Sequence, residues 1–185
     1  MDLRQLSMSF NGIHFEEKRN IQCLLEKAKL LERLRLSLAV NMGLSLVGVL
    51  STCARTVKVL DLTVPLYQHH VPPLAGLCEE LEAMAGHNTL EVLSFGVCVE
   101  AHHSEYFVGS TIQKVENVLV KPGWSALRQV SFKLLVIPWE GSADLTEALQ
   151  SLDSLPDKYL NHLPKLESVV FDYSVYPASY AVLNL

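Results

Sequence analysis

Two pairs of adjacent histidines come nearer to a metal site than any other residues of this chain. His69 and His70 form one pair, and His102 and His103 form the other. Imidazole is a common zinc ligand. Neighbouring loop residues rarely point at one ion, however, and no two histidines have the spacing of one helical turn. We therefore expect polar loops without a metal. The alternative is a metal-dependent or hydrolase-type enzyme with its site on these loops.

The cysteines do not form a recognisable metal or redox motif. Cys23, Cys53, Cys78 and Cys98 contain no pair separated by two residues, so neither a zinc site nor a thioredoxin-like motif is predicted. No signal peptide opens the sequence. We expect reduced thiols and an intracellular protein, cytoplasmic or nuclear.

The serines and acidic residues also have plain structural interpretations. Ser110 and Ser142 follow glycines and are interpreted as helix caps, because no nucleophile-elbow motif is present. The pairs Glu79–Glu80 and Glu16–Glu17 are expected on solvated helix faces. No glycine-rich phosphate loop occurs. We therefore expect no catalytic residue and no cofactor.

Composition narrows the class of protein further. The chain has 185 residues, of which 49% are apolar and 19% charged, so disorder is excluded as its main state. The net charge of −5 disfavours a nucleic-acid binder. Residues 36–52 carry no charge, but they are short and polar for a membrane span. A strand followed by a short helix over 41–50 explains this stretch better.

A leucine motif recurs along the chain. The pattern L-x-x-L-x-L, with apolar substitutions, occurs six times, and its first positions are Leu3, Leu31, Val57, Leu90, Leu127 and Leu166. Apolar and polar residues alternate after each start, as in Leu60 to Val64, which predicts half-buried strands. The whole of residues 1–185 is therefore interpreted as one repeat array.

Helical periodicity separates these strands. Apolar stripes of helical spacing run over 21–28, 74–84, 112–119 and 145–152, with Gly86 as a C-terminal cap of the second. Strands that alternate with helices predict an α/β fold with a parallel sheet. A doubly wound sheet is the second architecture considered, although no phosphate loop follows any strand.

This register resembles the leucine-rich repeat of the ribonuclease-inhibitor type. The resemblance implies an irregular solenoid, or horseshoe, of about six strand-helix units. In that family an Asn or Cys occupies the ninth motif position. Asn11 and Cys98 match it here, whereas Ala39, Pro65, Leu135 and Ser174 depart from it.

Two segments near the C-terminus resemble a particular group of repeat proteins more closely than the motif alone does. Residues 123–132 (GWSALRQVSF) and 155–174 (LPDKYLNHLPKLESVVFDYS) resemble the repeat region of fungal F-box proteins. The resemblance implies a non-catalytic protein–protein interaction module that recognises substrates for a ubiquitin ligase. The F-box itself is absent from this sequence, which begins inside a repeat. A truncated gene product without a function of its own is therefore a further alternative.

In such an array, equal motif positions form columns on the concave face. The candidate partner-binding residues of these columns are Arg33, Arg35, Asp61, Thr63, Ser94, Gln129, Ser131, Lys133 and Asp172. Arg35 is expected beside Asp61, and Lys133 beside Asp172. Such pairs also stabilise a sheet by about 0.2–1 kcal/mol each, which is their structural interpretation. The expected partner is a protein, with no nucleic acid and no membrane.

The two ends of the array carry separate expectations. The first strand is expected to be an open edge, through which the chain associates with itself. The apolar segment 174–185 is expected to cover the last repeat.

Overall fold

A computed structural model describes residues 3–10, 15–38, 48–66, 77–101, 105–138 and 145–177, and structural statements below concern these residues. The strands are β1 (Gln5–Phe10), β2 (Arg33–Leu38), β3 (Val59–Leu66), β4 (Val92–Glu100), β5 (Gln129–Ile137) and β6 (Val170–Pro177). The helices are α1 (Phe15–Lys27), α2 (Leu77–Met84), α3 (Glu105–Leu119), α4 (Leu145–Asp153) and α5 (Leu155–Tyr159), with short 3-10 turns η1 (Ser51–Cys53) and η2 (Leu163–Lys165).

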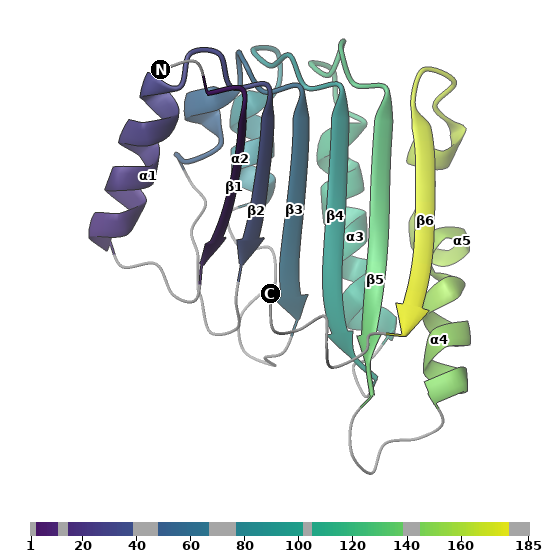
Figure 1. The fold of residues 1–185 in the computed structure, drawn as a ribbon. Helices are drawn as coiled ribbons and strands as arrows, with labels where there is room; N and C mark the ends of the chain where they lie inside the picture. Colours follow the sequence, from purple (N-terminus) through teal and green to yellow (C-terminus); the bar gives the residue numbers. More distant parts are fainter. Residues whose placement is uncertain are drawn as a thin grey trace.

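The strands form one sheet in sequence order. Every neighbouring pair is parallel, which confirms the expected α/β fold with a parallel sheet. Parallel neighbours require a crossover connection on one face. The described helices all contribute side chains to one apolar core, and Figure 1 shows α2 to α5 behind the sheet.

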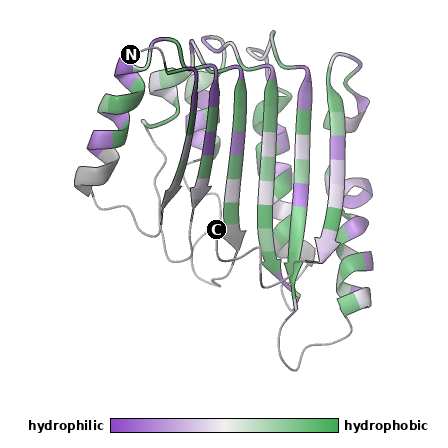
Figure 2. Cartoon of the chain, viewed as in Figure 1, coloured by the Kyte–Doolittle hydropathy of each residue, from purple (hydrophilic) through white to green (hydrophobic). Residues whose placement is uncertain are grey.

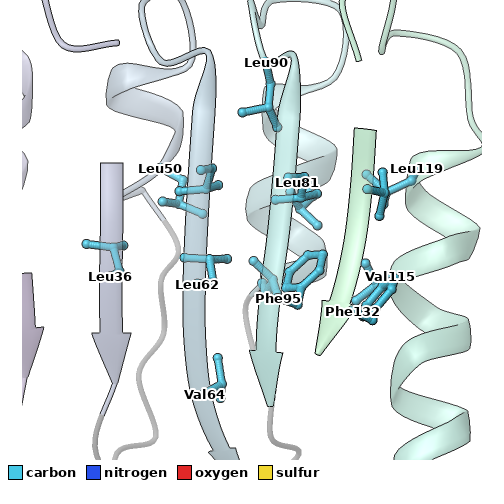
Figure 3. Packing of buried hydrophobic residues seen from close by; sticks show 14 of the residues in the cluster. Leu36, Leu50, Leu62, Val64, Leu81, Leu90, Phe95, Val115, Leu119 and Phe132 are labelled. Carbon is cyan, nitrogen blue, oxygen red and sulfur yellow. The ribbon is translucent and has the colours of Figure 1, made fainter. Parts of the chain in front are cut away.

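Apolar side chains at the fourth and sixth motif positions form this core. Equivalent residues lie side by side along the sheet: Leu34, Leu60, Leu93 and Val130 in one row, and Leu36, Leu62, Phe95 and Phe132 in the next. All eight are almost fully buried. The rings of Phe95 and Phe132 stack with centroids 4.9 Å apart, and Figure 3 shows them facing the helices. The repeated motif thus places equivalent residues in one continuous seam.

The sixth strand departs from the expected register by two residues. Phe171 pairs with Val130, so the first motif position is Ser168 and not Leu166. The reason is a turn before β6, in which Val169 N–H donates to the Leu166 carbonyl oxygen at 3.2 Å. Leu166 therefore packs against the core from the approach to the strand.

Most of the expected helices are present where the structure describes the chain. The stripes in α1, α2 and α4 face the core, and Gly86 follows α2 with a φ of +78°. The expected cap at Ser110 is wrong, because α3 begins at Glu105 and Ser110 lies inside it. Helical packing continues upstream of Ser110 through the buried Val108. Ser142 and residues 41–47 lie outside the described residues.

Two glutamates join the helices to the short turns. Glu80 of α2 accepts hydrogen bonds from the backbone N–H groups of Gly48, Leu50 and Ser51. Its side chain is 1% exposed, so the expectation of a solvated Glu80 is wrong. The three backbone donors at the start of η1 replace the water that a buried carboxylate loses.

Glu116 of α3 plays the same part at η2. It accepts hydrogen bonds from the N–H groups of Asn161, His162 and Leu163 at 2.8–3.2 Å. Like Glu80, it is 1% exposed. The side chains of Glu16 and Glu17 lie outside the described residues.

Among the described helices, none combines the length and apolar character that a membrane crossing requires.

Candidate interaction face

The face of the sheet opposite the helices carries three rows of mostly polar side chains, which we call the open face. The rows are Gln5, Arg33, Val59, Val92, Gln129 and Val170; Ser7, Arg35, Asp61, Ser94, Ser131 and Asp172; and Ser9, Ser37, Thr63, Gly96, Lys133 and Ser174. None of the described helices lies on this face (Figure 1). The strands thus hold each row in a fixed spacing of about 4.8 Å.

The structure brings all nine candidate residues onto the open face. Arg33, Gln129, Lys133 and Asp172 are exposed, whereas Thr63 and Ser94 are half-buried. Ser131, in the middle row with strands on both sides, is only 3% exposed. Ser131 thus forms the floor of the face, and the charged residues project from it.

One expected ion pair is present and the other is corrected. Arg35 and Asp61 are direct neighbours, with Arg35 Nη2 3.6 Å from Asp61 Oδ2. Lys133 pairs with Ser174, and Asp172 pairs with Ser131, because of the two-residue shift of β6. Lys133 and Asp172 therefore occupy different rows. Lys133 has no ion pair among the described residues.

A row of alternating charge crosses the sheet just before the strands begin, and the sequence reasoning missed it. The carbonyl groups of Arg4, Glu32, Lys58 and Glu91 each accept backbone hydrogen bonds from the start of the next strand. Arg128 continues the row. Lys58 Nζ lies 3.6 Å from Glu32 Oε1. The second motif position alternates in sign from repeat to repeat, which is the signal that could have revealed this row.

The open face becomes apolar at the carboxyl ends of its central strands. Cys98 of β4 and Leu135 and Ile137 of β5 form a small cluster separate from the main core. In Figure 2 these strand ends are coloured as hydrophobic. The ninth motif position therefore lies on the open face in β4 and β5, because both strands stay extended through it. This departs from the buried asparagine of the family that the motif resembles.

The residues with metal or nucleophilic chemistry do not converge in the described structure. No group of three metal-ligating side chains occurs among the described residues, and the two histidine pairs lie outside them. Cys53 is buried, which raises the pKa of its thiol from 9.0 to about 12. Burial also raises the pKa of Cys78 and Cys98. These thiols are therefore held in the protonated form, which is a poor nucleophile.

No protein-family model, curated protein or solved structure matches this chain.

Proposed function

We propose that this protein is a non-catalytic interaction module that binds a partner protein on the open face. One observation carries the proposal. Six strands in consecutive order present their polar positions in register on the face that the described helices leave uncovered. Extended faces of this kind are the binding surfaces of repeat proteins.

The charges of the open face indicate the chemistry of the partner. Within its three polar rows, Arg33, Arg35 and Lys133 outnumber Asp61 and Asp172, although the whole chain has a net charge of −5. Arg35 already pairs with Asp61. Arg33 and Lys133 have no ion pair within the described part of the chain, and both are exposed. A partner segment that carries carboxylates complements these two cations.

A finer form of the proposal concerns the fold family and the cellular role. The motif and the consecutive parallel strands support an irregular leucine-rich-repeat solenoid. The resemblance of residues 123–132 and 155–174 to fungal F-box proteins supports substrate recognition for a ubiquitin ligase. The extended ninth position in β4 and β5 is the main departure from the repeat family.

Charge reversal on the open face tests the interaction. Three proteins are used in parallel to capture partners from a cell lysate: the unaltered chain, the double variant Arg33→Glu/Lys133→Glu, and the single variant Lys114→Glu. Lys114 is exposed on α3, on the helix side, and serves as the matched control. Partners retained by Lys114→Glu and lost by the double variant support the proposal. An identical partner set for all three chains overturns it.

The ubiquitin-ligase role has its own test. A partner that depends on Arg33 and Lys133 is followed in cells with and without this protein. Its ubiquitylation is expected to fall, and its half-life to lengthen, when the protein is removed. Unchanged ubiquitylation overturns the ligase role and leaves the interaction module standing.

A further inference from the structure

The turns that lead into the six strands carry an excess of basic residues. These turns comprise residues 3–4, 28–32, 54–58, 85–91, 120–128 and 160–169. Seven of the 15 lysines and arginines of the chain lie in them, but only three of its 20 acidic residues do. The turns are thus net positive in a chain whose net charge is −5.

The sheet brings these turns to one edge of the molecule, which we call the turn edge. All six strands are parallel to their neighbours, so their amino ends share that edge (Figure 1). Backbone hydrogen bonds join one turn to the next: Glu32 N–H donates to the Arg4 carbonyl oxygen at 2.9 Å, and Lys58 N–H to that of Glu32 at 2.8 Å. Neighbouring turns therefore lie about 4.8 Å apart, and the six together span about 24 Å.

Most of the cations of the turn edge are not neutralised within the described structure. Lys58 Nζ lies 3.6 Å from Glu32 Oε1, and Lys121 Nζ lies 2.6 Å from Glu82 Oε1. The other five cations are exposed and have no ion pair in the described parts of the chain: Arg4, Lys29, Arg55, Arg128 and Lys165. A row of like charges creates a positive potential that attracts an anionic partner.

The ends of the helices explain only part of this excess. A cation near the last turn of a helix is stabilised by the helix dipole. Lys29 follows α1 closely, so this explanation covers it. Arg128 lies well beyond the end of α3, and Arg4 precedes β1. These two side chains make no hydrogen bond or ion pair among the described residues, so the fold does not account for their charge.

The residues of the turn edge favour an acidic polypeptide over a nucleic acid or a membrane. Trp124 is the only aromatic residue of these turns and is 8% exposed, so no ring is available to stack on bases. Leu30 is their only large apolar residue that is exposed, which is too little to insert into a membrane. Glu91 and Glu167 interrupt the cations and would repel a continuous phosphate backbone, whereas a polypeptide can place its carboxylates at the cations alone.

We propose that the turn edge binds an acidic polypeptide segment of a partner protein, which lies across the starts of the strands. At about 3.3 Å per residue, an extended segment of about seven residues covers the whole edge. Complementary charge of this kind speeds association and is weakened by salt. The turn edge does not contain the two cations on which the capture experiment depends. Failure of that experiment therefore leaves this second surface standing.

A synthetic peptide of about ten glutamates with a fluorescent label tests the proposal, with anisotropy as the measure of binding. The edge variant is Arg55→Glu/Arg128→Glu. The charge-matched control is Arg19→Glu/Lys114→Glu, which reverses two exposed cations on α1 and α3. The edge variant is expected to bind the peptide about tenfold or more weakly than the control. Raising sodium chloride from about 0.05 M to about 0.5 M is expected to weaken binding to the unaltered chain.

A second pair of substitutions and two other anions make the result decisive. Arg4→Glu/Lys165→Glu, at the two ends of the turn edge, should weaken binding as the edge variant does, and urea titrations check that every variant is folded. Equal affinities of the edge and control variants, or no measurable binding to the unaltered chain, overturn the proposal. A single-stranded RNA of about ten nucleotides and phosphatidylserine vesicles are measured in parallel. Tighter binding of either one, lost in the edge variant, overturns the polypeptide as the ligand.

Discussion

The three central strands and the last strand carry the same repeated motif but are held by different forces. In β3, β4 and β5 the fourth and sixth motif positions are almost fully buried between neighbouring strands and the helices. In β6 the equivalent residues, Phe171 and Tyr173, are only half-buried. A hydrogen bond from Tyr173 Oη to the Leu152 carbonyl oxygen, 2.5 Å long, ties β6 to α4.

This difference shows what an edge strand needs in addition to an apolar pattern. A central strand is placed by burial on both sides, and a register error there would move its whole apolar set out of the core. An edge strand has half as many neighbours. Its position is therefore set more by individual polar contacts, such as the hydrogen bond of Tyr173 in β6 itself and those of Glu116 to residues 161–163, upstream of the strand.

The largest expected effect comes from the aromatic ladder. Phe132→Ala should lower the free energy of unfolding by about 3–5 kcal/mol, since it opens a cavity between two strands and α3. The ring of Phe171 lies 6.1 Å from that of Phe132, and it is only half-buried. Phe171→Ala should therefore cost about 1–2 kcal/mol, because this ring buries less apolar surface on folding than Phe132 does. Urea titrations of both variants measure the contrast. Equal losses would mean that β6 is held as the central strands are.

The buried glutamates provide the next contrast. Glu116→Ala leaves three backbone donors unpaired before β6 and should cost about 3 kcal/mol. Glu80→Ala is the matched variant at η1, and a similar loss is expected there. Hydrogen exchange distinguishes the two sites, since only Glu116→Ala should speed exchange in β6. Faster exchange of β6 in Glu80→Ala would contradict this local effect.

A smaller effect is expected from the hydroxyl of Tyr173. Tyr173→Phe removes its bond to Leu152 and leaves that carbonyl without the hydroxyl donor, at a cost of about 1 kcal/mol. Tyr176→Phe is the control, because Tyr176 is 49% exposed on the same strand. Chemical denaturation of the two single variants gives the difference. No loss in Tyr173→Phe would show that packing alone holds β6.

The smallest expected effect is a loss of folding stability that is absent near neutral pH and develops at alkaline pH. The unfolded chain releases the Cys53 proton near its ordinary pKa of 9.0, whereas the folded chain keeps it up to a pKa of about 12. The contribution of Cys53 to stability should therefore be constant below pH 9 and fall as pH rises from there towards 12. Burial also raises the pKa of Tyr173, so β6 adds a second fall that begins above the ordinary tyrosine pKa of 10.0.

Stability measured against pH separates these two regions. Cys53→Val should reduce the earlier part of the fall, to which Cys78 and Cys98 also contribute because burial raises the pKa of their thiols, and Tyr173→Phe should reduce the later part. Both variants are compared with the unaltered chain by denaturant titration at each pH. Parallel curves for all three proteins would contradict the assignment of the fall to these groups.

The apolar core could be predicted from the sequence more completely than the polar contacts could. The motif predicted five strands in their observed register, and the helical stripes predicted the core-facing side of α1 to α4, whereas α5 (Leu155–Tyr159) was not predicted. Glu80 was misjudged as solvated, although it has helical spacing with the buried Leu77 and Met84. Glu116 stands in the same relation to Ile112 and Leu119. That spacing was the available signal, but the backbone donors that make burial tolerable come from distant segments.

The segment 174–185 was expected to cover the last repeat, but residues 174–177 belong to β6. Residues 178–185 lie outside the described residues. Self-association through the β1 edge stays a prediction, as does the absence of catalysis. Sedimentation of the purified chain at high concentration tests the first, and a monodisperse monomer would contradict it.

The sequence alone determined the alternation of strand and helix, the α/β class and the seam of apolar side chains, because these depend on local periodicity. The tertiary structure alone decided the two-residue shift of β6, the burial of two glutamates and the apolar end of the open face. Each of these depends on groups that are far apart in the chain and meet only on folding. Local patterns record which side of an element is apolar, whereas contacts between elements decide which polar groups find partners.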